Sequence, residues 1–166
     1  MALISLLSSL SAFFYITPMH SLKATVLSNL REMVKLQHAA HDSMFKFSIK
    51  KMWPISLIAP QVDWIRITRM METLQETCAK QCEFVEKERI NAPEEELPFL
   101  KIVPSYIKSL SQVAELLGKA ASYKQDVLEN KIKATFKEWN EILKAYNQAS
   151  DEMATTGIVL YKACEG

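Results

Sequence analysis

Glycine is scarce in this chain, and the scarcity limits the folds open to it. Only Gly118, Gly157 and Gly166 occur among the 166 residues. The glycine-rich phosphate loops G-x-G-x-x-G and G-x-x-x-x-G-K-[ST] cannot be written anywhere, which excludes Rossmann dinucleotide binding and P-loop nucleotide hydrolysis. An all-β fold is disfavoured too, because its many tight turns need residues that tolerate positive φ. With 49% hydrophobic residues to form a core, we predict an all-α protein.

The charges nearly cancel over the whole chain but not along it. Twenty basic and 19 acidic residues give a net charge of +1, so the chain is no polycation built for nucleic acid. Residues 21–60, however, hold six basic and only two acidic side chains. We expect no nucleic-acid partner.

The first twenty residues contain no Lys, Arg, Asp or Glu, and Leu3 to Ile16 form a mostly apolar run. The run is shorter than the roughly 20 residues of a membrane-spanning helix. Its length suits a signal peptide, although no basic residue precedes it and no A-x-A-like site follows. The other interpretation is an apolar helix that packs on the domain or lies in a membrane interface. We therefore treat 1–20 as an apolar N-terminal segment and 21–166 as one helical domain.

Apolar periodicity and prolines predict the first two helices. Ser21 is a plausible N-cap for a helix that runs to about Met52, where Trp53-Pro54 ends it. An apolar connector to Pro60 leads to a second helix, from about Gln61 to Asn91. This helix carries a heptad stripe with spacings of 3 and 4, typical of long helices that pack at a shallow angle. The stripe consists of Trp64, Ile67, Met71, Leu74, Cys78, Gln81 and Val85. Its opposite side holds most of the charges of the helix.

From Ser105 to about Met153 the helical pattern continues without a proline. A single helix of this length would be about 73 Å long, so either the chain folds back near Ser122-Tyr123 or the protein is elongated. We expect Gly157 to end the helix and a short apolar tail to follow. The predicted buried stripe consists of Ile107, Leu110, Ala114, Leu117, Ala121, Leu128, Ile132, Phe136, Trp139, Leu143 and Tyr146.

Chemically reactive side chains are few. His38 and His41 lie three residues apart and Cys78 and Cys82 four apart, so one alternative is a His₂Cys₂ zinc site. We prefer core thiols without a metal, because Cys78 occupies a stripe position where Leu would serve equally well. An odd number of cysteines also favours a compartment inside the cell. No spacing supports a nucleophile–base pair, so we expect no catalytic residue and no cofactor; Glu94 to Glu96 we expect to be solvated.

Lysines are the candidate site residues. Lys46, Lys50 and Lys51 follow the first predicted helix, and Lys131, Lys133 and Lys137 recur within two turns of the last one. A basic helical surface of this kind is attracted to anionic lipid, by about 1 kcal/mol per residue close to the membrane. We predict that these six lysines bind an anionic membrane surface.

Residues 98–146 resemble the BAR superfamily of membrane-curvature sensors. The segment PFLKIVPSYIKSLSQVAELLGKAASYKQDVLENKIKATFKEWNEILKAY looks like the join between the second and third BAR helices, with regularly spaced leucines and an aromatic, here Trp139, that closes a turn. The resemblance implies long helices that dimerise, and hence a homodimer.

Together these features predict an antiparallel bundle of three to four long helices, coiled-coil-like and elongated. As a function we expect a non-enzymatic, BAR-like scaffold, peripheral to a membrane inside the cell, that binds anionic lipid or a protein partner. The alternative is a secreted helical bundle, cytokine-like or effector-like, whose first 20 or so residues are removed.

Overall fold

The computed structural model describes residues 21–45 and 62–165. These residues form four long helices, α2 (Leu22–Phe45), α3 (Trp64–Glu88), α4 (Leu97–Leu128) and α5 (Phe136–Glu165), with a short 3-10 helix η3 (Arg89–Asn91) after α3. The described residues contain no strand, so the predicted all-α class is confirmed. The apolar segment 1–20 and the lysines Lys46, Lys50 and Lys51 lie outside the described residues.

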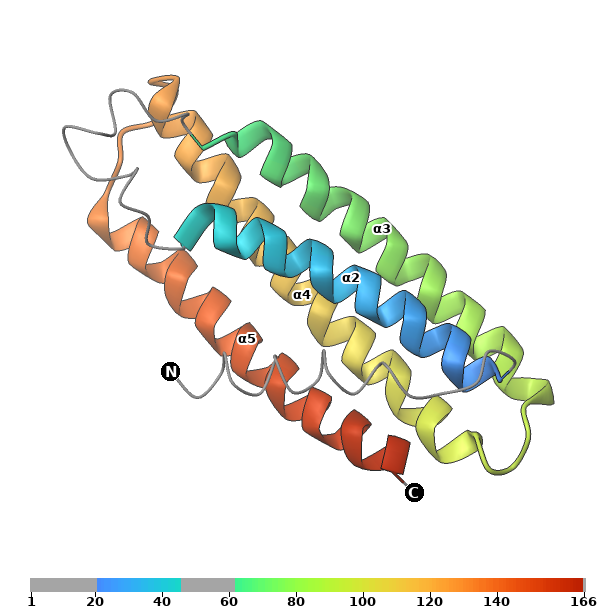
Figure 1. The fold of residues 1–166 in the computed structure, drawn as a ribbon. Helices are drawn as coiled ribbons and strands as arrows, with labels where there is room; N and C mark the ends of the chain where they lie inside the picture. Colours follow the sequence, from blue (N-terminus) through green and yellow to red (C-terminus); the bar gives the residue numbers. More distant parts are fainter. Residues whose placement is uncertain (1–20, 46–61, 166) are drawn as a thin grey trace.

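Successive helices run in opposite directions and form a bundle that is longer than it is wide (Figure 1). Helix α4 is the central element, since α2, α3 and α5 all pack against it. Its 32 residues correspond to a length of about 48 Å. The predicted antiparallel bundle of long helices is therefore confirmed.

The heptad stripe of α3 faces the core. Six of its seven members are buried, from Ile67 to Val85, and Trp64 at the start is half-buried. Its main neighbour is α4 of the same chain. The long helix against which the stripe packs is thus α4 of the same chain. The stripe by itself therefore does not predict a dimer.

Two helix starts follow from side-chain caps. Ser21 caps α2 as predicted, because its Oγ accepts a hydrogen bond from the Ala24 N–H at 3.1 Å. Helix α3 starts at Trp64, three residues later than expected, because Asp63 Oδ1 accepts from the Arg66 N–H at 2.9 Å. Each cap satisfies a backbone donor that the first helical turn leaves without a partner.

Helix α4 begins at Leu97 and not, as we predicted, at Ser105. Pro98 lies in the first turn, where a proline costs no hydrogen bond, and Pro104 is accommodated inside the helix. The expected solvation of the three glutamates is wrong for Glu96, which is only 7% exposed. Its Oε2 accepts the Lys23 backbone N–H at 3.3 Å, which attaches the start of α4 to the first turn of α2.

Of the two alternatives for residues 105–153, a fold-back or a single long helix, the structure has the fold-back: a turn at residues 129–135, a little beyond Ser122-Tyr123, separates α4 from α5. Asn130 has a φ of 55° and ends α4 in the left-handed region. The Asn130 N–H donates to Val127 O at 3.1 Å and the Lys131 N–H to Asp126 O at 2.9 Å. This is the Schellman arrangement, in which a residue with positive φ satisfies the last helical carbonyls.

A reciprocal cap then starts α5. Thr135 Oγ1 accepts from the Glu138 N–H at 3.2 Å, and the same hydroxyl donates to Glu138 Oε2 at 2.6 Å. Thr135-x-x-Glu138 thus joins the cap residue and the third helical residue of an S/T-x-x-E helix start. Here Glu138 accepts from the Thr135 hydroxyl, and the Thr135 N–H donates to Tyr123 Oη. Helix α5 runs through the buried Gly157 to Glu165, so the expected end at Gly157 is wrong. Packing outweighs the helix-weakening effect of one glycine, because Leu160 beyond it is buried.

The turn predicts opposite effects of two small substitutions at Asn130. Asn130→Ala should lower the free energy of unfolding by about 1 kcal/mol, because a Cβ penalises the left-handed conformation and alanine lacks the amide that compensates for it. Asn130→Gly should leave stability unchanged or raise it slightly. Urea unfolding of the two variants measures the difference; equal stabilities would contradict the left-handed turn.

Candidate functional site

Three large apolar side chains lie uncovered at the end of the bundle where α4 turns into α5. Leu128 is 57% exposed, Ile132 40% and Phe136 83%. We predicted these residues in a buried stripe; they are exposed because the turn at 129–135 takes them off the helix face that packs. Ile107, Leu110, Ala114, Leu117 and Ala121, earlier in the same stripe, are buried as expected. Adjacent exposed apolar residues of this size mark interaction sites more often than isolated ones do.

The predicted lysines Lys131, Lys133 and Lys137 are interspersed in sequence with these apolar residues, and all three are exposed. Lys131 and Lys133 lie in the turn and Lys137 in the first turn of α5, so the expectation that they share one continuous helix face is wrong. Lys131 pairs with Glu129 and with Asp126, the latter at 3.7 Å. Lys133 and Lys137 form no ion pair with any described residue. Their charges are therefore available to an external anion.

Aromatic contacts brace this end of the bundle. Tyr123 of α4 stacks on Trp139 of α5 with ring centroids 6.0 Å apart, and the Lys124 ammonium lies 3.8 Å from the Trp139 ring centroid. The Tyr123 hydroxyl oxygen accepts the Thr135 N–H at 2.9 Å. The turn that presents the apolar and basic side chains is thus attached to both helices.

The last residues of α2 reach the same end. His41 Nδ1 and Tyr146 Oη are 2.7 Å apart, and Phe45 packs against both rings at centroid distances of 5.1 and 5.6 Å. The C-terminal end of α2 and the start of α3 lie at this end of the bundle as well (Figure 1). We call Leu128, Ile132, Phe136, Lys133 and Lys137 the apolar–basic end.

The histidines and cysteines considered for zinc do not converge. His41 contacts Tyr146 of α5, whereas Cys78 lies beside Ser111 of α4. No three His, Cys, Asp or Glu side chains gather in a metal-binding cluster within residues 21–45 and 62–165. Burial raises the pKa of Cys78 to about 12, which keeps the thiol protonated and a poor ligand or nucleophile.

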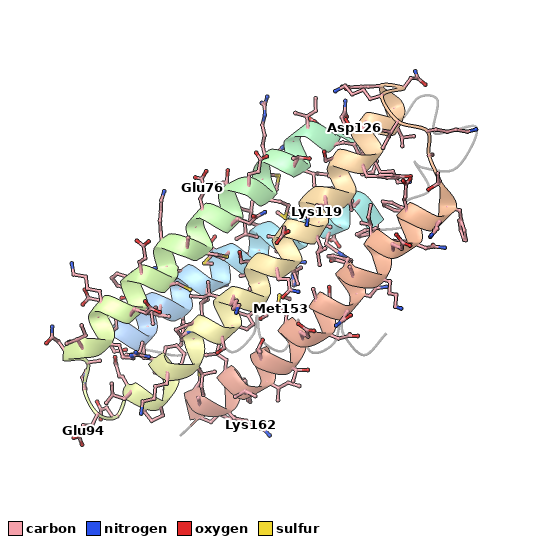
Figure 2. The ribbon with its side chains drawn as sticks, turned by 180° about the vertical axis from the view of Figure 1, so that it is seen from behind. Glu76, Glu94, Lys119, Asp126, Met153 and Lys162 are labelled. Carbon is pink, nitrogen blue, oxygen red and sulfur yellow. The ribbon has the colours of Figure 1, made fainter. Side chains whose placement is uncertain are left out.

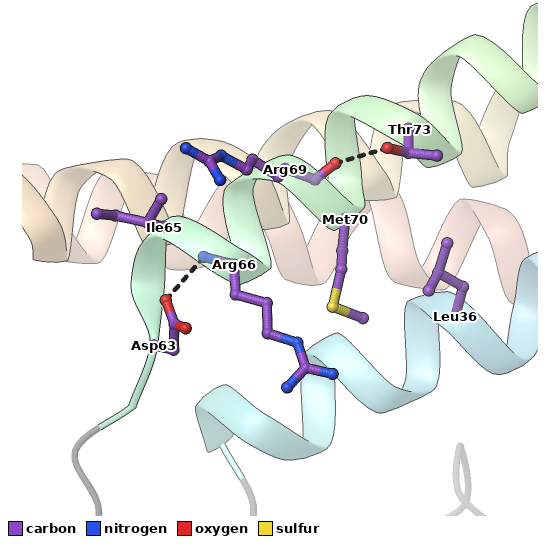
Figure 3. A pocket seen from close by; sticks show the side chains of 7 residues that line it. All are labelled: Leu36, Asp63, Ile65, Arg66, Arg69, Met70 and Thr73. Carbon is purple, nitrogen blue, oxygen red and sulfur yellow. Dashed lines mark hydrogen bonds between the residues drawn. The ribbon is translucent and has the colours of Figure 1, made fainter.

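A shallow groove between α2 and α3 is the other surface feature that a ligand could use. One depression of about 420 Å³ is lined by Leu36, Arg66 and Met70 among others, and Figure 3 shows Arg66 extending from α3 towards α2. The acidic and hydroxyl groups of this depression serve the helix backbone: Asp63 caps α3, and Thr73 Oγ1 donates to Arg69 O at 2.9 Å. The acidic and hydroxyl side chains of this depression are thus engaged in backbone hydrogen bonds.

None of the described helices combines the length and the hydropathy that crossing a membrane requires. Comparison of the chain with models of known protein families, with curated proteins and with solved structures found no match. Two sequence signals would have revealed the candidate site: Asn130 as a helix end and Thr135-x-x-Glu138 as a helix start.

Two half-buried histidines of α2 predict a pH-dependent stability. Burial lowers the pKa of both His38 and His41 below the usual 6.5, although Asp42 partly opposes the shift. Below about pH 6.5 the unfolded chain therefore binds more protons than the folded one, and the free energy of unfolding falls as the pH falls. We expect urea midpoints to decrease from pH 7 towards acid in the wild type, and to do so less in His38→Gln/His41→Gln. An unchanged pH slope in the double variant would be inconsistent with this assignment.

Proposed function

We propose that this chain is a non-enzymatic helical module that binds an anionic membrane surface through the apolar–basic end. The observation that supports it is the juxtaposition of three exposed apolar side chains with Lys133 and Lys137, which have no acidic partner among the described residues. Apolar groups that enter the interface and cations that meet lipid phosphates are the two contributions that interfacial binding combines.

The expected affinity is modest and reversible. Each lysine near an anionic surface contributes about 1 kcal/mol, and burial of a Leu, Ile or Phe side chain contributes about 1.5–3 kcal/mol when it is complete. The three apolar side chains at this end would enter the membrane interface only in part. Binding therefore needs both their burial and the attraction of the lysines to anionic lipid. Neither the lysines nor the apolar residues alone should retain the protein on vesicles.

The resemblance of residues 98–146 to BAR proteins is consistent with this placement. That segment covers most of α4, the turn and the first part of α5, so the join that prompted the resemblance is the apolar–basic end. A BAR-like role inside the cell, peripheral to a membrane, is part of the proposal. No reaction is assigned to the chain, because Cys78 stays protonated and the Ser109 hydroxyl is engaged with Thr156 Oγ1 at 2.8 Å.

Co-sedimentation with vesicles tests the proposal. The full chain should sediment with phosphatidylserine–phosphatidylcholine vesicles and not with phosphatidylcholine alone, and less so as salt rises from roughly 0.05 to 0.3 M, because exposed charges become screened. Reversal of Lys131, Lys133 and Lys137 to Glu should abolish binding. Among single variants, Lys133→Glu should weaken binding more than Lys131→Glu, because Lys131 is already paired with Glu129 and Asp126.

Two further variants separate the contributions. Ile132→Ser/Phe136→Ser should reduce binding by a similar factor at low and high salt, since the lost contribution is not electrostatic. Lys101→Glu/Lys108→Glu, exposed on α4 away from this end, is the matched control and should bind like the wild type. If the wild type stays in the supernatant with anionic vesicles at low salt, the membrane role is wrong and a protein partner at this end becomes the better hypothesis.

A further inference from the structure

The side of α3 that faces away from the bundle carries an ordered row of charges. Its members, which we call the outer row, are all exposed and recur at intervals of three or four residues: Arg69, Glu72, Glu76, Lys80 and Glu83. Figure 2 shows Glu76 on the outer edge of α3. The row lies opposite the buried stripe, so no helix of this chain that the structure describes covers it.

The outer row has no ion pair within the described part of the chain. The salt bridges recorded there involve Lys35, Lys119 and Lys131 and none of the five. Glu76 and Lys80 are four residues apart, a spacing that permits a pair on one helix, and still do not form one. The five charges are thus open to an external partner.

The charges of the outer row are arranged symmetrically about Glu76, with opposite signs at equal distances on its two sides. Arg69 lies seven residues before Glu76 and Glu83 seven after it, while Glu72 and Lys80 lie four residues on either side. In each pair the two charges are opposite. A second α3, antiparallel and related by a two-fold axis at Glu76, would therefore place each Arg69 opposite Glu83 of the other copy and each Glu72 opposite Lys80.

An exposed apolar residue lies beyond each end of the row: Ile65 is 45% exposed and Ile90, in η3, 81% exposed. The exposed Lys87 lies between Glu83 and Ile90. In the same antiparallel register each Ile65 lies opposite Lys87 of the other copy and within one helical turn of its Ile90. The Glu76 carboxylates meet at the axis, where the Lys80 ammonium of the other copy is one turn away from each of them.

From this pattern we infer that the outer row of α3 is a self-association surface, and that its partner is a second copy of this chain in an antiparallel, two-fold arrangement. In such a contact residue i meets residue j and j meets i, which is the symmetry of the row. Exposed ion pairs add little affinity singly, but complementary ones fix register and exclude wrong partners. The dimer is consequently expected to be weak, salt-sensitive and specific. The inference does not depend on membrane binding, since the apolar–basic end takes no part in it.

Charge exchange tests the inference, with light scattering or sedimentation equilibrium to measure mass. The wild type should show twice the 19.0 kDa of one chain at low salt and dissociate as salt rises. Arg69→Glu/Lys80→Glu and Glu72→Lys/Glu83→Lys should each be monomeric, because like charges then face one another. An equimolar mixture of the two should form a heterodimer, and one chain that carries all four changes should dimerise again. The control Lys101→Glu/Lys108→Glu on α4 should dimerise like the wild type.

Cysteine cross-linking tests the register, in chains whose three native cysteines are replaced by alanine. Glu76→Cys lies on the axis and should oxidise to a covalent dimer, whereas Glu83→Cys alone should not, because it faces Arg69. Addition of Arg69→Cys to Glu83→Cys should restore the cross-link. A wild type that is monomeric throughout the micromolar range at low salt, or a dimer whose mass none of the charge variants changes, would overturn the inference.

Discussion

The turn between α4 and α5 is the constraint on which the rest of the structure depends. Without it, the apolar pattern from Ser105 onwards would extend as one helix of about 73 Å, and α4 would lack its neighbour on one side. Asn130 in the left-handed region ends α4, and the reciprocal Thr135–Glu138 cap starts α5 within a few residues. The same turn creates the apolar–basic end, because it removes Leu128, Ile132 and Phe136 from the packed face.

Helix α4 packs against three neighbouring helices because small and apolar residues lie on the sides that face them. Where it meets α3, a Cβ on Gly118 would lie 3.3 Å from the Met71 Cβ, closer than most such contacts, so glycine allows the two helices their approach. Where it meets α5, the buried Ser109 hydroxyl has its partner in Thr156, as a buried polar group requires. Helix α2 is secured at its two ends, by Glu96 at the first turn and by Tyr146 near the last.

The periodicity of the apolar residues predicted the helices and their buried faces. It did not predict the helix ends that a few polar residues determine. The 3.6-residue period was sufficient for the helices and for the buried stripe of α3, and Ser21 was recognisable as a cap. A fold-back was considered near Ser122-Tyr123, but the position of the turn at 129–135 was missed, because the apolar spacing continues through it and no glycine or proline marks it. The site residues Lys131, Lys133 and Lys137 were therefore correctly found exposed but assigned to a helix face. The exposure of Phe136 depends on where the chain reverses, and in the sequence only Asn130 and Thr135-x-x-Glu138 mark that place.

The distance between α4 and α5 in solution tests the reversal most directly. Spin labels at Gln112→Cys and Glu152→Cys, in a chain whose native cysteines are replaced by alanine, can be measured by double electron–electron resonance. Both positions are exposed, and they lie near the level at which Ser109 meets Thr156. Packed antiparallel helices, with axes about 8–10 Å apart, predict a single distance below about 30 Å. A distance near 60 Å, which a continuous helix of 40 residues would give, would contradict the fold and with it the exposed end on which the proposed function rests.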